Sequence, residues 1–104
     1  MKKTLLILIL SICIFAGTIF SSAWLVLQCE QYAIGSNIHS YRDALWWSLN
    51  VSSVGDTDFQ PVTMLGRTVG AITILIGATQ FSLTTGLLAA IFSYFIKKEL
   101  NINE

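Results

Sequence analysis

The sequence has few charged residues. Only 12% of its 104 residues are charged, about half the usual share in a soluble domain, and the formal net charge is zero. Such a chain lacks the basic surface by which proteins bind nucleic acid, so we expect no nucleic-acid partner. The charges that are present sit at the two ends and in the middle of the chain.

The uncharged stretches are long. No charged residue stands between Leu5 and Gln28, or between Thr68 and Ile96. Each stretch exceeds the ~20 residues that a helix needs to cross ~30 Å of hydrocarbon at ~1.5 Å per residue. The sequence therefore predicts a membrane protein of one domain, residues 1–104, with spanning helices over 4–28 and 64–96.

Two alternatives apply to these spans. The first 23 residues combine a basic start, an apolar stretch and small residues at the end, which is typical of a secretory signal peptide cleaved near Trp24. Against this, the apolar run continues through "WLVLQC" and is long for such a signal. The second span could be the core helix of a soluble protein, but no other segment is available to bury it.

The lysines predict the orientation. Lys pairs occur at residues 2–3 and 97–98, whereas the part between the spans holds no Lys. Because cytoplasmic segments carry the excess of basic residues, we expect both termini in the cytoplasm of a multi-pass protein of the plasma membrane. The part between the spans, with four acids and two Arg, then faces outside with a charge of −2.

The sequence gives no indication of an enzymatic function. The only His, His39, has no Cys or acid at ligand spacing, so we interpret it as a solvated loop residue. Cys13 and Cys29 are ~24 Å apart along one helix and cannot pair within the chain. We interpret both as apolar fillers, with Cys29 able at most to link subunits. No catalytic or cofactor motif occurs, so the prediction is a non-enzyme without cofactor or small-molecule substrate.

A half-length helix lies between the spans. "HSYRDALWWSLNV" predicts a helix over 41–51, with Ser40 as N-cap and Asp43 in a capping box. At ~16 Å it has half the length of a span. Polar residues follow, and polar backbone at membrane depth is tolerated only inside protein or beside water. The pattern indicates a re-entrant loop that lines a cavity surrounded by several copies of the chain.

At this loop the sequence resembles the pore module of bacterial two-transmembrane potassium channels. The matching motifs are "YRDALWWSL", "SSVG", "DTDFQPVTMLGR" and "AITILIGATQFSLTT". The resemblance implies an all-α membrane protein whose two transmembrane helices flank a re-entrant pore helix over 41–51 and a filter loop over 52–58. It further implies assembly as a homotetramer in lipid, with permeant cations as the only ligands.

The resemblance places the ion path along the filter loop. The implied filter residues are Ser53, Val54, Gly55, Asp56, Thr57 and Asp58. The first three keep the family's inner filter and would supply oxygens to potassium or sodium.

The outer part of the filter departs from the family pattern. The family's TVGYG reads SVGDT here, so Thr57 replaces a Gly that takes positive φ, and a β-branched residue disfavours that conformation. We expect a different, wider path there. An Asp at position 56 resembles the filter of the sodium-and-potassium-conducting channels. That resemblance implies calcium as a further ligand, at Asp56. The alternative for Asp56 is a solvated Asx-type turn. For Asp58 the family implies a structural hydrogen bond behind the filter, to a partner near Leu49 or Asn50.

The second span carries the family's gate positions. Gly77 matches the hinge, and Thr85 and Ala89 match the narrow cytoplasmic constriction. A mid-helix Gly costs ~1 kcal/mol relative to Ala and lets the helix bend. The alternative for Gly77 is a Gly that serves close packing. The sequence thus predicts a tetrameric pore that conducts potassium and sodium passively and is calcium-permeable or calcium-blocked. The alternative is a non-conducting membrane protein or accessory subunit derived from a channel pore.

Overall fold

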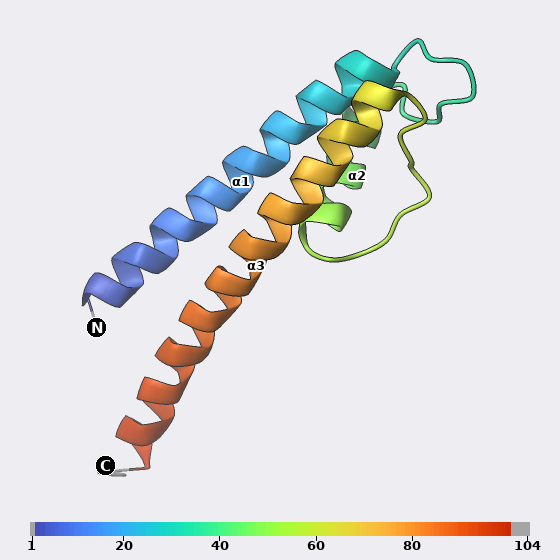
Figure 1. Cartoon of the computed structure of the whole chain (residues 1–104). Helices are drawn as coiled ribbons and strands as arrows, with labels where there is room; N and C mark the ends of the chain where they lie inside the picture. The colour runs from blue at the N-terminus through green and yellow to red at the C-terminus, as the bar shows by residue number, and fades with distance from the viewer. Residues whose placement is uncertain (1, 101–104) are drawn as a thin grey trace.

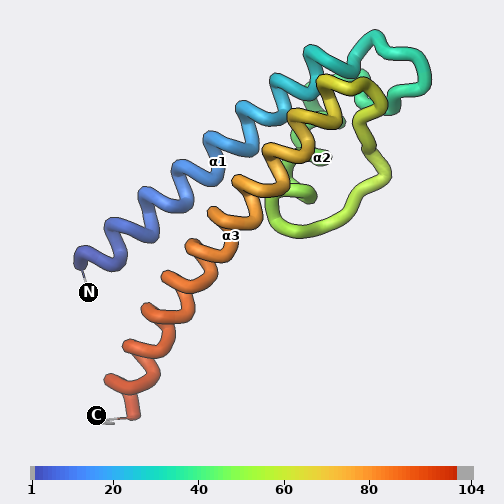
Figure 2. The backbone as a smooth tube through the Cα atoms, viewed as in Figure 1, coloured from blue at the N-terminus to red at the C-terminus, as the bar shows by residue number. Residues whose placement is uncertain are grey.

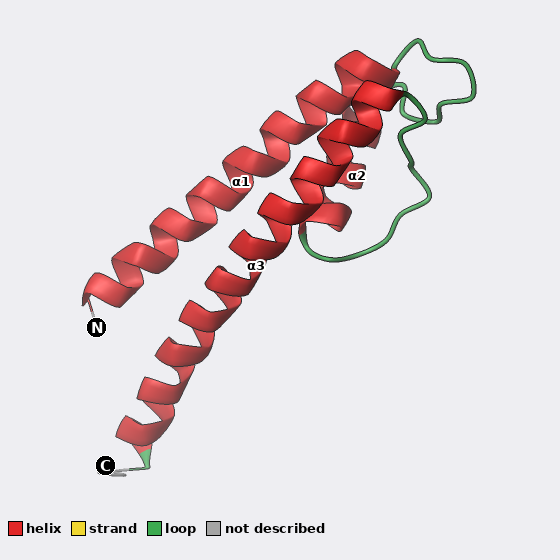
Figure 3. Cartoon of the chain, in the orientation of Figure 1, coloured by secondary structure: helices red, strands yellow, loops and turns green. Residues whose placement is uncertain are grey.

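Three helices make up the fold. The computed structural model describes residues 2–100, with α1 over Lys2–Glu30, α2 over Tyr41–Ser52 and α3 over Met64–Glu99 (Figure 1). Within that range the remaining residues form turns and loops, and there is no strand (Figure 3). The predicted all-helical fold with two long apolar helices is confirmed. Each helix extends beyond its predicted bounds, α2 by one residue at its C-terminal end.

The two long helices run antiparallel along an elongated molecule of 61 × 21 × 20 Å (Figure 2). They lie side by side near the loops and separate toward the chain ends. Two hydroxyl pairs join them, Ser22 with Thr73 at 3.0 Å and Ser11 with Thr84 at 2.6 Å. Hydroxyl pairs of this kind hold neighbouring helices together where water is absent.

The short helix α2 packs against the end of this pair that carries the loops (Figure 1). Its N-cap is Ser40, whose hydroxyl accepts from the N–H of Asp43 at 3.2 Å, as the capping pattern predicts. Two side chains of α2 bind carbonyl oxygens of α1: Tyr41 Oη donates to Phe20 at 3.1 Å and Ser48 Oγ to Ile19 at 2.8 Å. These bonds fix the direction in which the end of α2 points.

The buried core lies where the three helices meet. Its fully buried side chains come from α1, from the connection after it and from α2: Ala23, Val26, Ile38, Ala44 and Trp47. Trp47 is only 2% exposed, whereas its neighbour Trp46 is 55% exposed. This small core stabilises the loop end of the molecule and positions α2.

Most apolar surface of the long helices is not covered within one chain. Many large apolar side chains of α1 and α3 are more than half exposed, for example Leu6, Ile14 and Leu75. Both helices are long and apolar enough to cross a membrane. Their outer faces are therefore suited to lipid or to further copies of the chain, and not to water.

Candidate functional site

The loop that follows α2 begins by folding back onto the end of that helix. The N–H of Ser53 donates to the carbonyl of Leu49 at 3.2 Å, and that of Gly55 to the carbonyl of Asn50 at 2.6 Å. The Ser53 hydroxyl also donates to the Leu49 carbonyl, at 2.7 Å. These groups satisfy carbonyls that helix ends otherwise leave free. Ser53 and Gly55 are thus placed together, but their N–H groups are used within the chain.

Val54 has an unusual backbone conformation. Its φ is +59°, and in the described range the only other positive φ belongs to Gly35. A β-branched residue in the left-handed region is strained by ~1–3 kcal/mol. The side chain gains no burial in return, because it is 68% exposed within one chain. The left-handed position therefore lies at Val54, whereas Thr57 does not adopt positive φ.

The acidic residues of the loop lie on its exposed side. Asp56 and Asp58 are exposed, and with Trp46, Thr57 and Phe59 they line a pocket of about 290 Å³. Asp56 Oδ1 accepts from the N–H of Thr57 at 2.8 Å. This bond to the next residue differs from the Asx-type turn considered for Asp56, in which the carboxylate accepts from the N–H two positions on. Across residues 2–100, no group of three or more His, Cys, Asp or Glu side chains could hold a metal ion.

The expected partner of Asp58 does not lie on α2. Asn50, at the predicted partner position, donates from Nδ2 to the carbonyl of Trp46 at 2.7 Å. No described hydrogen bond joins Asp58 to Asn50 or Leu49. Asp58 is held instead through its backbone, because its carbonyl accepts from Asn37 Nδ2 at 2.8 Å.

Glu30 is the residue that sequence reasoning missed. It is 0% exposed at the end of α1. Its Oε1 accepts from the N–H of Val62 at 2.7 Å, and its Oε2 from the N–H and hydroxyl of Thr63 at 2.8 and 2.6 Å. The carboxylate thus lies at the N-terminal end of α3, where a negative charge is favoured.

The environment of Gly66 follows from this contact. A Cβ at Gly66 would overlap Glu30 Oε2, so only Gly allows the carboxylate to approach α3 so closely. Thr63 is the N-cap of α3 and accepts from the N–H of Gly66 at 2.9 Å. A lone acid at the end of an apolar run, with a Thr-x-x-Gly helix start later in the chain, is the only sequence signal of this site.

Gly77 lies against the end of α2. A Cβ placed on it would come within 2.6 Å of Ser52 Cα and 2.9 Å of the Ser52 carbonyl oxygen. Real Cβ atoms do not approach backbone this closely, so the contact requires Gly. Helix α3 is continuous through this position. The packing alternative for Gly77 thus has a physical cause, and the hinge stays a prediction.

The remaining gate positions lie beyond α2 along α3. Thr85 and Ala89 are both exposed in the single chain. The neighbouring Thr84 faces α1, where it pairs with Ser11 at 2.6 Å. Since successive residues of a helix point ~100° apart, Thr85 is directed away from α1. Both predicted gate residues are therefore free to face a space outside this chain.

Several known potassium channels are similar to this chain in sequence. Potassium voltage-gated channel subfamily A member 5 of Rattus norvegicus is 31% identical over 93 residues, which cover 88% of this chain and 15% of that protein. The protein of the same name from Homo sapiens is 30% identical over 93 residues with the same coverage. Potassium voltage-gated channel subfamily A member 7 of Homo sapiens is 33% identical over 88 residues, or 83% of this chain and 19% of that protein.

This chain thus spans less than a fifth of the length of these relatives. The resemblance to potassium-channel pores is confirmed as a relation of families. A family model described as "Ion channel" matches residues 6–94, which is most of the chain. With its half-length helix between two membrane-length helices, the chain belongs to the ion channel family.

Proposed function

We propose that several copies of this chain form a pore that conducts potassium and sodium ions passively, with potassium somewhat favoured. The observation that carries the proposal is the segment 53–58, with its exposed acids Asp56 and Asp58, which follows a half-length helix and lies beside two membrane-length helices. Polar backbone is stable at membrane depth only inside protein or beside water. A water-filled path between copies meets that condition.

The proposed assembly is a homotetramer. Each chain supplies one loop, and a ring of four loops would surround the path with backbone oxygens, as in potassium-channel filters. The open apolar surface supports association, since an apolar groove of about 800 Å³ lies between α1 and α2 beside the loop. Large exposed apolar surfaces of this kind mark contacts with protein or lipid.

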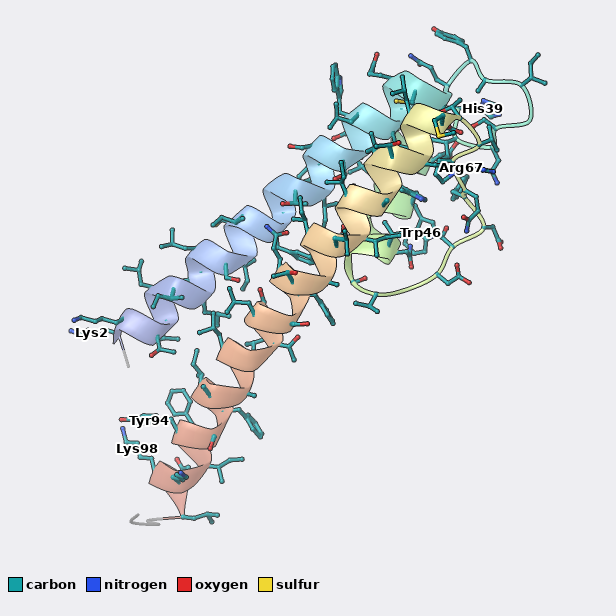
Figure 4. All side chains as sticks on the ribbon, in the orientation of Figure 1. Lys2, His39, Trp46, Arg67, Tyr94 and Lys98 are labelled. Carbon is teal, nitrogen blue, oxygen red and sulfur yellow. The ribbon has the colours of Figure 1, made fainter. Side chains whose placement is uncertain are left out.

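The proposed orientation has both termini in the cytoplasm of a plasma-membrane protein. Lys2 and Lys98 lie at one end of the molecule, and His39 and Arg67 at the opposite end beside the loops (Figure 4). Basic residues favour the cytoplasmic side, so the loop end faces outside.

Ion selection is proposed to occur at residues 53–55, near the C-terminal end of α2. That end carries about half a negative charge, which favours a cation. Only these residues keep the family's inner filter types, so an ion would cross partly hydrated and the preference for potassium over sodium would be modest. Four copies of Asp56 would concentrate cations outside and form the place where calcium binds or blocks.

A non-conducting membrane protein is the second candidate, and one observation favours it. The N–H groups of Ser53 and Gly55 are used to cap α2, and Val54 between them is strained. A chain that kept this arrangement after assembly would not present its carbonyls in a row. Ion flux separates the two candidates.

The test is reconstitution of purified protein into liposomes. We expect potassium and sodium flux above that of protein-free liposomes, and no flux of the large cation N-methylglucamine. Under bi-ionic conditions the reversal potential should lie between zero and the potassium equilibrium value. A stable assembly without flux would favour the non-conducting candidate, and a reversal potential at the potassium value would contradict the mixed permeation.

A further inference from the structure

Asn37 makes an unusual pair of contacts from the connection between α1 and α2, residues 31–40. Its Nδ2 donates to the carbonyl of Asp58 at 2.8 Å, and its Oδ1 accepts from the N–H of Gln60 at 3.3 Å. These two backbone groups lie on either side of Phe59. The side-chain amide thus pairs with the loop as a neighbouring strand would, with one donor and one acceptor directed at alternate residues.

The backbone that carries Asn37 is well supported. Ile38 is fully buried in the core, and Ser36 is also buried. The Ser36 hydroxyl accepts from the N–H of Ile38 at 3.1 Å, which closes a small turn around Asn37. Asn37 is therefore exposed but stands between two buried residues, so its amide has a fixed base.

The opposite side of the loop offers no comparable support. The amide of Asn50 on α2 is directed to the carbonyl of Trp46 at 2.7 Å. For the part of the chain described here, Asp58 has its hydrogen bond to Asn37 and none to α2. The family resemblance leads one to expect this support from the pore helix, α2. Here it comes instead from the connection between α1 and α2.

We propose that Asn37 is a positioning residue for the pore entrance. By binding the backbone on both sides of Phe59, it sets where the loop leaves the pore and how Asp56 and Asp58 stand around the entrance. The contact holds the backbone of Asp58 directly, and only Thr57 separates Asp58 from Asp56. This role rests on the proposed conducting function, but the contact itself is measurable without ion flux.

The first test reads the contact by hydrogen exchange in the reconstituted protein. The Gln60 N–H donates to Asn37, so Asn37→Ala should lower its protection about five-fold, the weight of one ordinary hydrogen bond. Gln31→Ala is the matched control, because Gln31 lies in the same connection and its side chain makes no described hydrogen bond. Asn50→Ala tests the rival anchor on α2. Unchanged protection in Asn37→Ala, or an equal loss in either other variant, overturns the proposal.

The second test reads the consequence at the entrance. Asn37→Ala should weaken block by external calcium about five-fold, since a freed loop no longer holds the acids together, while the assembly elutes and melts as the wild type does. A change in melting without a change in block means a structural role only and overturns the proposal. If the wild type conducts nothing, the proposed function fails, while hydrogen exchange still decides the role of Asn37.

Discussion

The loop between α2 and α3 has two halves that are held in different ways. The distal half, residues 58–63, is bound by side chains from far along the sequence, Asn37 and Glu30. The proximal half, residues 53–57, makes described hydrogen bonds only to residues within five positions of itself. One half is therefore fixed by the fold of a single chain, and the other depends on its own local geometry.

This difference matches what each half is proposed to do. The distal half connects α2 to α3 and has the same role in each copy, so long-range bonds within one chain can hold it. The proximal half contains the proposed ion ligands, which in the proposed assembly face the same residues of other copies. A segment whose partners lie in other chains has only local bonds in its own chain, and it is where assembly should change the backbone most.

The largest expected effect comes from releasing the distal half. Glu30→Ala removes the acceptor of two backbone N–H groups and one hydroxyl, all at Val62 and Thr63. These donors are only partly buried, so each loses less than the ~1–3 kcal/mol of a fully buried unpaired donor, and the variant should lose about 3 kcal/mol of unfolding free energy in all. Denaturation in mixed micelles, followed by tryptophan fluorescence, measures this loss.

Glu99→Gln is the matched control for that variant, since Glu99 is exposed at the opposite end of the molecule. It should unfold with the wild type. Glu30→Gln, which keeps one acceptor oxygen, should lie between wild type and Glu30→Ala. Wild-type stability of Glu30→Ala would mean that the distal half is no better held than the proximal half.

Two glycines of α3 provide the next test, because only one of them contacts α2, the helix that directly precedes the proximal half. In Gly77→Ala the new methyl group would meet Ser52 backbone at 2.6 Å, whereas Gly86→Ala meets nothing within 4 Å. Overpacking should cost Gly77→Ala ~1–3 kcal/mol of unfolding free energy. Gly86→Ala should be neutral or stabilised, since Ala favours helix by up to ~1 kcal/mol. A change in channel opening without loss of stability in Gly77→Ala would favour the hinge instead.

The parts of the fold that were predictable from sequence are those that depend on local pattern. The uncharged stretches identified both long helices, and Ser40 with Asp43 marked the start of α2. The end of α2 was placed one residue early, at 51 instead of Ser52. The sequence offered no stop signal there, because the termination depends on Val54 accepting a left-handed conformation that its type disfavours.

The contacts that hold the site were not predictable in the same way. Glu30 and Asn37 act on residues 21 to 33 positions away, and a single polar residue carries no periodic pattern that indicates its partner. Gly77 was recognised as special, but its contact with Ser52 depends on how α2 and α3 cross. Residue type thus indicated importance, and only the three-dimensional arrangement supplied the reason.

A smaller effect is expected from relieving strain in the proximal half. Val54→Gly places at φ +59° a residue that tolerates this conformation. A left-handed backbone costs other residues ~1–2 kcal/mol more than Gly, and part of that gain is lost to the greater freedom of Gly when unfolded. The variant should gain about 1 kcal/mol of unfolding free energy. Val54→Ile keeps the branched side chain and serves as control. A destabilised Val54→Gly would mean that assembly moves Val54 out of this conformation.

The smallest effect tests whether the proximal half faces the ion path at all. Asp56→Asn removes the charge but keeps an oxygen that can accept from the N–H of Thr57, so this local hydrogen bond should survive. With four charges lost from the proposed entrance, single-channel conductance at low salt should fall roughly two-fold, because fewer cations gather there. The difference should vanish near 1 M salt, where charges are screened within ~3 Å. Planar-bilayer recordings across a salt series measure it, and equal conductance at low salt would mean that Asp56 points away from the path.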